Sequence, residues 1–579
     1  MRLVICEYLS MLKESGELDA LLPDLLFSMD IIPLSTAQVG VRQYGVDVAA
    51  IGSDPEDNGI TKLFLVTIKR GDFSRKIWDD GTPQAIRPSL NEIVDVYIPR
   101  QVDDHHKSIP KKVIVCCGGD LKQEVEDNWK GYKSEHSKTG ELEFDLWDGN
   151  KLAFLIEKYL LDEYLFPESV QKNLRKTIAL ADQNEDEPRY FYQLIEETLF
   201  NHNLPKDKKK SGEQKRQKAL NLLDLSLNIV FHWCQEADNL RPSLLCAERL
   251  LLRTWDWIRK SDLLDCKKTI DGFLKLFFTY IKIGRTYIVK VQPHCFVRDG
   301  LFGYGGDELE YPLRTFELIG VMGSLSMAHY FCAHLNQNEE MKREYIEQTE
   351  AIAETLLALI ENNSSAHSPR YDEHGIDIVL GLLTLKSINY RQDLAADWVI
   401  RISQTIIRGY KLGKNFPIAS DSYEQLVALQ FDQAPFKEKL MQLSTILPML
   451  ADWYAIFDLE AEYLSFQEAV TNVLASTDLQ YWFPDETTDE YLYACNAGYE
   501  SGLTVSSVKL TESIEKHKLL MVRLLEKHQG FKDISCFTHG FPFLSLISSR
   551  HFRTPVIPTF WQCEVLAPKP LEDIKVTDE

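Results

Sequence analysis

An aspartate and a lysine on two consecutive predicted strands are the residues of this chain best placed to do chemistry. Asp47 opens the apolar run 48–51, and Lys69 closes the next run, residues 63–68. If the two strands are neighbours, Asp47, residue 67 and Lys69 lie at one end of a sheet. A carboxylate can hold Mg²⁺, which polarises a phosphate and lowers the pKa of bound water, and a lysine can orient that water and stabilise developing negative charge. The grouping therefore suits phosphodiester cleavage.

The order of these residues resembles the PD-(D/E)xK restriction-endonuclease-like superfamily, in particular its Mrr-like branch. That branch has an N-terminal helix bearing a Glu, then G-x-D, then (E/Q)-x-K at the end of the following strand. Here the matching residues are Gly45-Val46-Asp47 and Thr67-Ile68-Lys69, with Glu17 or Asp19 as the helix acid. The resemblance covers about residues 15–170 and implies a restriction-endonuclease-like fold for this part of the chain.

The resemblance also implies roles for individual residues. Asp47 would bind Mg²⁺ or Mn²⁺, Lys69 would be the catalytic lysine, and Glu17 would be the acid of the helix. The implied activity is that of an Mg-dependent endodeoxyribonuclease, with DNA as the substrate and RNA as the alternative.

The chain departs from the family at Thr67, where the family carries an acid or Gln. A neutral hydroxyl is a poor magnesium ligand compared with a carboxylate. The main-chain carbonyl of Ile68 could still bind the metal, and Glu92 or Asp95 on the next helix could supply a migrated carboxylate. Three interpretations of the pair Asp47 and Lys69 stay open: a catalytic pair, an inactivated nuclease fold used for binding, and unrelated structural charges.

The elements that must position these residues read as a small α/β domain. Short apolar runs at 63–68 and 112–117 are typical of strands buried on both faces of a sheet. Helical spacing of apolar residues recurs in residues 17–27, 88–96 and 150–164. We therefore expect residues 1–175 to form one small α/β domain, which the resemblance implies is a nuclease domain.

A different pattern begins after an acidic linker near residues 180–190. The basic run 206–218 suits a solvated loop leading into a helix better than a nucleic-acid contact. Beyond it, 3.6-residue apolar spacing dominates without a shared repeat signature. We therefore expect a linker at 176–218 and an all-α regulatory, sensor or interaction domain at 219–579. The fold class expected for the whole chain is α+β/α multidomain, with a small α/β N-terminal domain and a large all-α domain.

Composition limits the partners. The 64 basic and 87 acidic residues give a net charge of −23, so the chain cannot coat nucleic acid or an anionic membrane non-specifically. The 11 cysteines include no C-x-x-C pair and read as reduced thiols, and no run of 18 apolar residues occurs. We expect a cytoplasmic protein without a membrane partner. His528 and His539 flank Cys536, which chance explains better than a nucleophile pair.

The functional expectation is a regulated nuclease effector of bacterial restriction or antiphage defence, since nucleases of the resembled branch are commonly fused to such helical modules. Its helical half would contact a protein partner or a second copy of the chain. The alternative is a catalytically inactive, nuclease-like scaffold or sensor that binds protein partners or nucleic acid.

Overall fold

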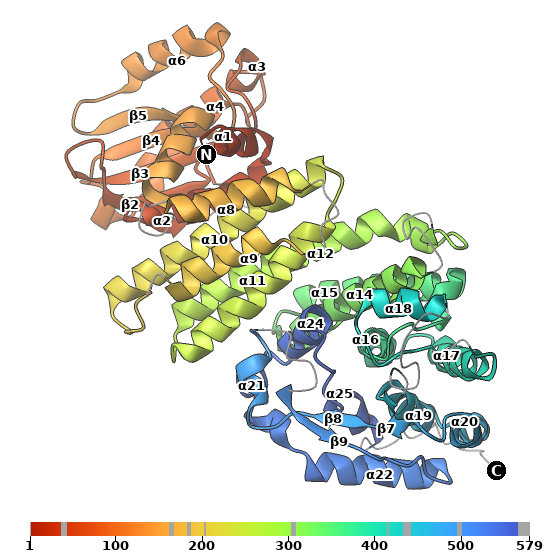
Figure 1. Ribbon diagram of the computed structural model, residues 1–579. Helices are drawn as coiled ribbons and strands as arrows, with labels where there is room; N and C mark the ends of the chain where they lie inside the picture. Colours follow the sequence, from red (N-terminus) through yellow and green to blue (C-terminus); the bar gives the residue numbers. More distant parts are fainter. Residues whose placement is uncertain are drawn as a thin grey trace, which may run out of the picture. The chain divides into compact units, whose positions relative to one another are not determined.

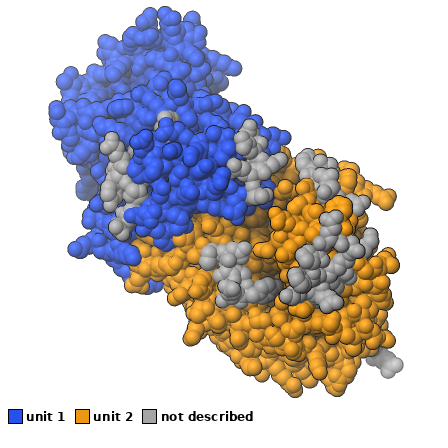
Figure 2. All heavy atoms as spheres, in the orientation of Figure 1, with its two compact units in different colours: residues 1–246, 265–279 blue, residues 247–264, 280–579 orange. Residues whose placement is uncertain are grey.

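The computed structural model describes residues 2–35, 43–160, 167–181, 187–201, 204–302, 309–413, 416–431, 440, 442–494 and 501–565. They belong to two compact units, residues 1–246 with 265–279 and residues 247–264 with 280–579 (Figure 2). The expected fold class is confirmed: a mixed sheet with helices occupies the first 160 or so residues, and a large, mostly helical region follows. The unit boundaries differ from the expected bounds 1–175, 176–218 and 219–579, and the division into domains at those residues stays a prediction.

The first unit begins with a five-stranded sheet in the order β1-β2-β3-β4-β5 (Figure 1). The strands are β1 (Ile31–Ser35), β2 (Val48–Ser53), β3 (Thr61–Lys69), β4 (Lys111–Cys117) and β5 (Leu142–Trp147). Pairing is antiparallel from β1 to β3 and parallel from β3 to β5. The apolar runs predicted as buried strands form β3 and β4. The edge strands β1 and β5 were not predicted. In β5 buried and half-buried residues alternate through most of the strand, so a continuous apolar run is lacking, and in β1 only Ile31 is buried.

Short helices surround this sheet. They are α1 (Arg2–Met11), α2 (Asp19–Ser28), α3 (Arg75–Trp78), α4 (Ile86–Glu92), α5 (Ile98–Arg100), α6 (Gln123–His136) and α7 (Gly149–Leu155), with helical turns η1 (Glu14–Leu18), η2 (Ile93–Tyr97), η3 (Asp104–His106) and η4 (Ile156–Leu160). The helix predicted at 88–96 is confirmed by α4 and η2. The helix predicted at 150–164 is confirmed as far as residue 160, and its last residues lie outside the described part of the chain.

The helix predicted at 17–27 is confirmed by the end of η1 and by α2, and the chain kinks just before it. Gly16 takes a φ of 80° there, a left-handed conformation that favours glycine, and α2 begins at Asp19. The kink decides which acidic residue reaches the end of β3.

The rest of the first unit is helical. It contains α8 (Glu168–Ala179), α9 (Arg189–Glu196), η5 (Glu197–Asn201), α10 (Lys210–Glu236) and the starts of α11 (Arg241–Lys260) and α12 (Lys267–Cys295). Helix α10 contacts α1, α2 and α8. Lys275 of α12 forms ion pairs with Asp24 of α2 and with Asp224 of α10. These contacts tie the helices α10 and α12 to the N-terminal sheet domain.

The second unit holds most of the remaining helices. They are α14 (Glu310–Leu335), α15 (Glu339–Asn362), η6 (Ser364–His367), α16 (His374–Ser387), α17 (Gln392–Lys411), α18 (Tyr423–Gln430), α19 (Ile446–Ile456), α20 (Glu460–Val473), α21 (Thr488–Tyr491), α22 (Ile514–Lys527), η9 (Gly530–Asp533), α23 (Ser535–Thr538), α24 (Phe543–Phe552), α25 (Thr559–Gln562) and η10 (Cys563–Val565). By length and composition α14 could cross a membrane, but most of its apolar window is buried inside the protein.

The second unit is not purely helical. Two small sheets occur, one of β6 (Leu443–Ser444) with β7 (Asp478–Leu479) and one of β8 (Tyr481–Phe483) with β9 (Leu503–Val505). Tyr481, Trp482 and Phe483 are at most 3% exposed. Consecutive buried aromatic residues favour an extended strand, because its side chains alternate between two faces.

Candidate functional site

A tight approach between the G-x-D segment and α4 sets the position of Asp47. Gly45 has a φ of 81°, and a Cβ atom at this position would lie 2.3 Å from the carbonyl oxygen of Ser89. A side chain at residue 45 is excluded on both counts. The glycine of the motif therefore serves the close packing of this loop on α4.

Asp47 is attached to β3 at two points. Its N–H donates to the carbonyl oxygen of Val66 over 2.8 Å, and its Oδ2 accepts the N–H of Ile68 over 2.7 Å. The next residue, Val48, pairs with Val66 in the antiparallel ladder. Asp47 and the end of β3 thus lie at the same end of the sheet, as expected, because both hydrogen bonds join Asp47 to main-chain atoms of β3.

Lys69 lies at the same edge and forms an ion pair. Its Nζ is 3.5 Å from Oε1 of Glu14, with side-chain exposures of 15% for Lys69 and 45% for Glu14. Sequence reasoning missed Glu14, because helical spacing was recognised only from residue 17 onward. The kink at η1 brings Glu14 to β3, and no local pattern in the sequence indicates it.

The electrostatics of Asp47 are those of a carboxyl group in a cluster of charges. Burial raises its pKa, and the negative charges of Glu14 and Asp19 raise it further, whereas the N–H of Ile68 and the ammonium of Lys69 lower it. The net result is a raised pKa. Such a carboxyl favours a bound cation, because the cation compensates the charge that burial penalises.

The two candidates for the helix acid differ in their surroundings. Oε2 of Glu17 accepts the N–H of Lys13 over 2.8 Å, so this carboxylate holds the kink between α1 and α2. Oδ1 of Asp19 is buried and has no hydrogen-bond partner in the described part of the chain. Because the charge of Asp19 also acts on Asp47, Asp19 is the better placed of the two, and the role predicted for Glu17 stays a prediction.

Thr67 is 1% exposed and pairs with Val115 of β4. Leu65 and Leu63, respectively two and four residues earlier on β3, belong to the core cluster that also contains Val115. Strand alternation therefore puts the Thr67 side chain on the same face of β3 as Leu63 and Leu65, where it is buried. The catalytic role that the resemblance implies for this motif position stays a prediction.

The predicted metal ligands were Asp47, Ile68 and Glu92. Asp47 and Ile68 are in direct contact, but the contact uses the N–H of Ile68 rather than its carbonyl oxygen. Within the described ranges, no group of three His, Cys, Asp or Glu side chains is arranged to hold a metal ion. Mg²⁺ is commonly bound through one or two carboxylates, with water and substrate phosphate completing its shell. The pair Asp47 and Asp19, with the orphaned buried oxygen of Asp19, fits such a site.

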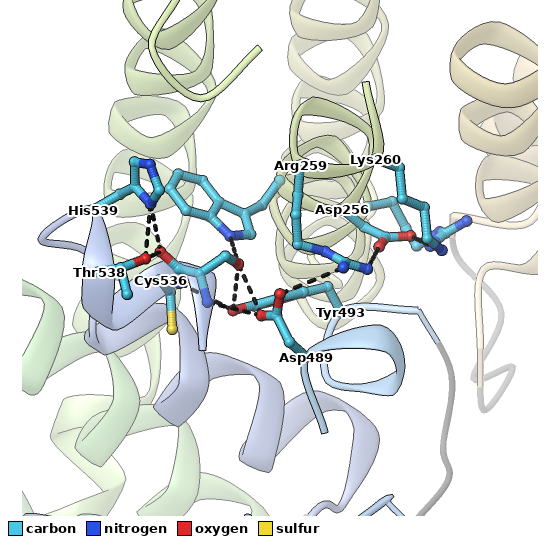
Figure 3. A network of polar contacts seen from close by, with 11 residues as sticks. Asp256, Arg259, Lys260, Asp489, Tyr493, Cys536, Thr538 and His539 are labelled. Atoms are coloured by element: carbon cyan, nitrogen blue, oxygen red, sulfur yellow. Dashed lines mark hydrogen bonds and ion pairs between the residues drawn. The ribbon is translucent and has the colours of Figure 1, made fainter. Parts of the chain in front are cut away.

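The region around Cys536 forms a different network (Figure 3). Cys536 is fully buried, and burial raises the pKa of its thiol to about 12. Nδ1 of His539 is 3.0 Å from the carbonyl oxygen of Ser535 and 2.9 Å from Oγ1 of Thr538. The imidazole is thus engaged elsewhere, and the geometry agrees with a coincidental Cys and His spacing.

Ser535 holds this network together. Its hydroxyl accepts the Nε1–H of Trp255 over 3.0 Å and donates to Oδ1 of Asp489 over 2.8 Å (Figure 3). Asp489 also pairs with Arg259, 3.4 Å away. These bonds join α11 to α21 and α23 within the second unit, so their role is structural.

Comparison of the chain with protein-family models, with curated proteins and with solved structures finds no match.

Proposed function

We propose that the N-terminal domain is a metal-dependent nuclease of the PD-(D/E)xK restriction-endonuclease-like superfamily, in its Mrr-like branch, and that it cleaves DNA. The observation that carries the proposal is the meeting of Asp47 and Lys69 at one edge of the sheet, in the order G-x-D then x-x-K. The orphaned buried oxygen of Asp19 beside this pair adds a second carboxylate.

Each residue has a task in this proposal. Asp47 and Asp19 would hold Mg²⁺ or Mn²⁺, which when bound supplies Lewis-acid polarisation of a phosphate oxygen. The ammonium of Lys69 orients a water molecule by hydrogen bonding and stabilises negative charge that develops on the phosphate. Glu14 is a positioning residue, because its carboxylate holds the Lys69 side chain at the edge of the sheet.

The charge of the whole chain favours control by a partner. With a net charge of −23, the protein repels DNA at long range, so its encounter with a substrate is slow without assistance. This supports an effector of bacterial restriction or antiphage defence in which the helical region recruits a protein partner or a second copy of the chain.

A catalytically inactive scaffold or sensor is the second candidate. It is favoured by Thr67, which places a neutral, buried side chain where the resembled family has an acid or Gln. In that case the domain would bind nucleic acid or protein without cleaving it.

Cleavage of plasmid DNA by the full-length protein separates the two candidates. The parent chain should nick or linearise the plasmid with Mg²⁺ or Mn²⁺ and lose this activity in a chelator, and Asp47→Ala should be inactive. Asp104→Asn is a matched control, because Asp104 is 88% exposed and pairs only at the surface with Lys107. Metal-dependent cleavage that Asp47→Ala leaves intact would refute the proposed site, and binding of DNA without cleavage would favour the scaffold.

A further inference from the structure

Cys266 occupies the N-terminus of α12, a helix of 29 residues. Its carbonyl oxygen accepts the N–H groups of Thr269 over 2.9 Å and Ile270 over 3.0 Å, so Cys266 is the N-cap residue. A negatively charged acceptor is stabilised in this position by the unpaired N–H groups and the dipole of the helix.

A buried guanidinium contacts the same sulfur. Arg216 of α10 is 1% exposed, and its Nη2 lies 3.9 Å from Sγ of Cys266. Its Nη1 donates to the carbonyl oxygens of Pro205 and Asp207 over 2.8 and 2.6 Å. Two of these three partners are neutral carbonyl oxygens. Of the three, only the sulfur can carry a negative charge that compensates the positive charge of Arg216.

A second buried donor points to the sulfur. Thr269 is 2% exposed, and within the described ranges its hydroxyl oxygen has no hydrogen-bond partner of ordinary geometry. Burial alone would raise the pKa of Cys266, but the hydroxyl and N–H of Thr269 and the charge of Arg216 together hold this pKa below its ordinary value. The surroundings of Cys266 are thus built for an anion.

The other described cysteines have the opposite environment. Burial raises the pKa of each of them: Cys6, Cys116, Cys117, Cys234, Cys246, Cys295, Cys332, Cys536 and Cys563. Cys563 is exposed, whereas Cys266 is only partly exposed. If exposure controlled the reaction rate, Cys563 would react faster; if the thiol pKa controlled it, Cys266 would react faster. The two causes can therefore be distinguished by experiment.

We propose that Cys266 is a reactive thiolate that forms a reversible mixed disulfide with low-molecular-weight disulfides. The thiolate attacks one sulfur atom of the disulfide, the old S–S bond breaks as the new one forms, and the displaced thiolate takes a proton from water. The sulfur of Cys266 is oxidised, and the displaced sulfur is reduced. The reaction needs no metal and does not depend on the proposed nuclease function.

The modification has a structural consequence in the first unit. It removes the negative charge that Arg216 and Thr269 stabilise, so the first turns of α10 and α12 lose a shared electrostatic contact, while the hydrogen bonds to the carbonyl oxygen of Cys266 remain. Amide hydrogen exchange at residues 267–270 should become faster after modification, because the cap of α12 is weakened.

The test uses the full-length protein and oxidised glutathione, with the extent of modification at each cysteine measured by peptide mass spectrometry. At pH 7 Cys266 should react at least ~3-fold faster than Cys563. Each unit by which a thiol pKa is lowered toward pH 7 increases the thiolate fraction about tenfold and decreases the nucleophilicity of the thiolate about threefold. The rate at Cys266 should also reach half its maximum below the ordinary thiol pKa of about 8.5. Reaction at Cys563 that equals or exceeds that at Cys266, or a midpoint at Cys266 of 8.5 or above, would overturn the proposal.

Two variants test the cause. Thr269→Val keeps the shape and the main-chain N–H but removes the hydroxyl, so the midpoint for Cys266 should rise. Arg216→Met should raise it further; if this variant does not fold, the result for Thr269→Val decides. Cys563→Ser is the matched control and should leave the rate at Cys266 unchanged. An unchanged midpoint in Thr269→Val, or in a folded Arg216→Met, would contradict the proposed activation.

Discussion

The main-chain N–H of Ile68 donates a hydrogen bond to Oδ2 of Asp47 over a distance of 2.7 Å. The bond fixes the carboxylate at the end of β3, one residue before Lys69. Since the donor belongs to the backbone, the position of Asp47 depends on the pairing of β2 with β3 and not on the identity of the side chains at residues 67 and 68. The departure at Thr67 therefore leaves the geometry of the pair Asp47 and Lys69 intact.

Asp47→Asn should stabilise the N-terminal domain at neutral pH. Because the folded state raises the pKa of Asp47, the unfolded chain releases this proton at a lower pH than the folded chain. Stability contributed by residue 47 is therefore present below the unfolded pKa of about 3.9 and is lost as pH rises through the folded pKa. We expect a gain on the order of 1 kcal/mol at pH 7 that disappears near pH 3, measured by urea unfolding of the full chain.

Asp54→Asn is the matched control with the opposite sign. Burial would raise the pKa of Asp54, but hydrogen bonds from the N–H of Glu56 and from Nζ of Lys112 and Lys62 hold it below its usual value. Its stabilising contribution is present above the unfolded pKa and is lost as pH falls through the folded pKa. Asp54→Asn should therefore destabilise the domain at pH 7. Equal shifts of the same sign in the two variants would contradict the environments described for them.

Lys69→Met should abolish most cleavage without unfolding the domain, because it keeps the aliphatic stem and removes the ammonium. We expect a loss of at least ~100-fold in cleavage rate, typical for removing one group that stabilises a transition state. Glu14→Gln should cost less, about 10-fold, since it only loosens the position of Lys69. Single-turnover cleavage of labelled DNA measures both, with circular dichroism as the check on folding. Unimpaired cleavage by Lys69→Met would place the reaction elsewhere.

The metal site can be tested through Asp47, Asp19 and Glu92. If Asp47 and Asp19 hold the metal, Asp19→Asn should raise the Mg²⁺ concentration needed for half-maximal cleavage, and so should Asp47→Asn, with partial rescue at high Mg²⁺ by mass action. Glu92→Gln should raise it only if a migrated carboxylate completes the site. The measurement is a Mg²⁺ titration of plasmid cleavage for each variant. A response confined to Glu92→Gln would replace Asp19 by Glu92 as the second ligand.

Thr67→Glu tests the departure from the resembled family. Because Thr67 is only 1% exposed, we expect a carboxylate at this position to cost on the order of 2 kcal/mol of stability. The variant should neither tighten Mg²⁺ binding nor increase cleavage. Isothermal titration with Mg²⁺ and a thermal unfolding scan measure the two effects. Tighter metal binding in a stable variant would show that residue 67 faces the metal after all.

Lys275→Met should destabilise the first unit. Lys275 pairs with Asp24 of α2 and, over 3.1 Å, with Asp224 of α10. Removing the ammonium leaves two largely buried carboxylates without a cation, which we expect to cost ~2 kcal/mol in urea unfolding. Lys268→Met is the matched control: Lys268 is 62% exposed and pairs with Glu213, so its loss should change stability by no more than ~0.5 kcal/mol. Equal losses of stability in the two variants would contradict the claim that Lys275 compensates the charges of two buried carboxylates.

The sequence by itself determined the central strands of the sheet and the pair Asp47 and Lys69. Continuous apolar runs identified β3 and β4, because strands buried on both faces need no polar alternation. The 3.6-residue spacing beyond residue 218 indicated a mostly helical region, in which α14 and α17 are two of the long helices. The spacing of G-x-D and x-x-K was enough to place Asp47 beside Lys69, since consecutive antiparallel strands bring the start of one to the end of the other.

Only the tertiary structure decided which further residues join them. The kink at Gly16 brings Glu14 to Lys69 and leaves Glu17 bonded to its own turn. The packing of β3 buries Thr67, and the packing of α2 leaves Oδ1 of Asp19 buried without a hydrogen-bond partner in the described part of the chain. Cys266 meets Arg216 although 50 residues separate them in the chain. Residue type and spacing encode local periodicity, but contacts between distant segments, and the pKa shifts they cause, arise only when the whole chain packs.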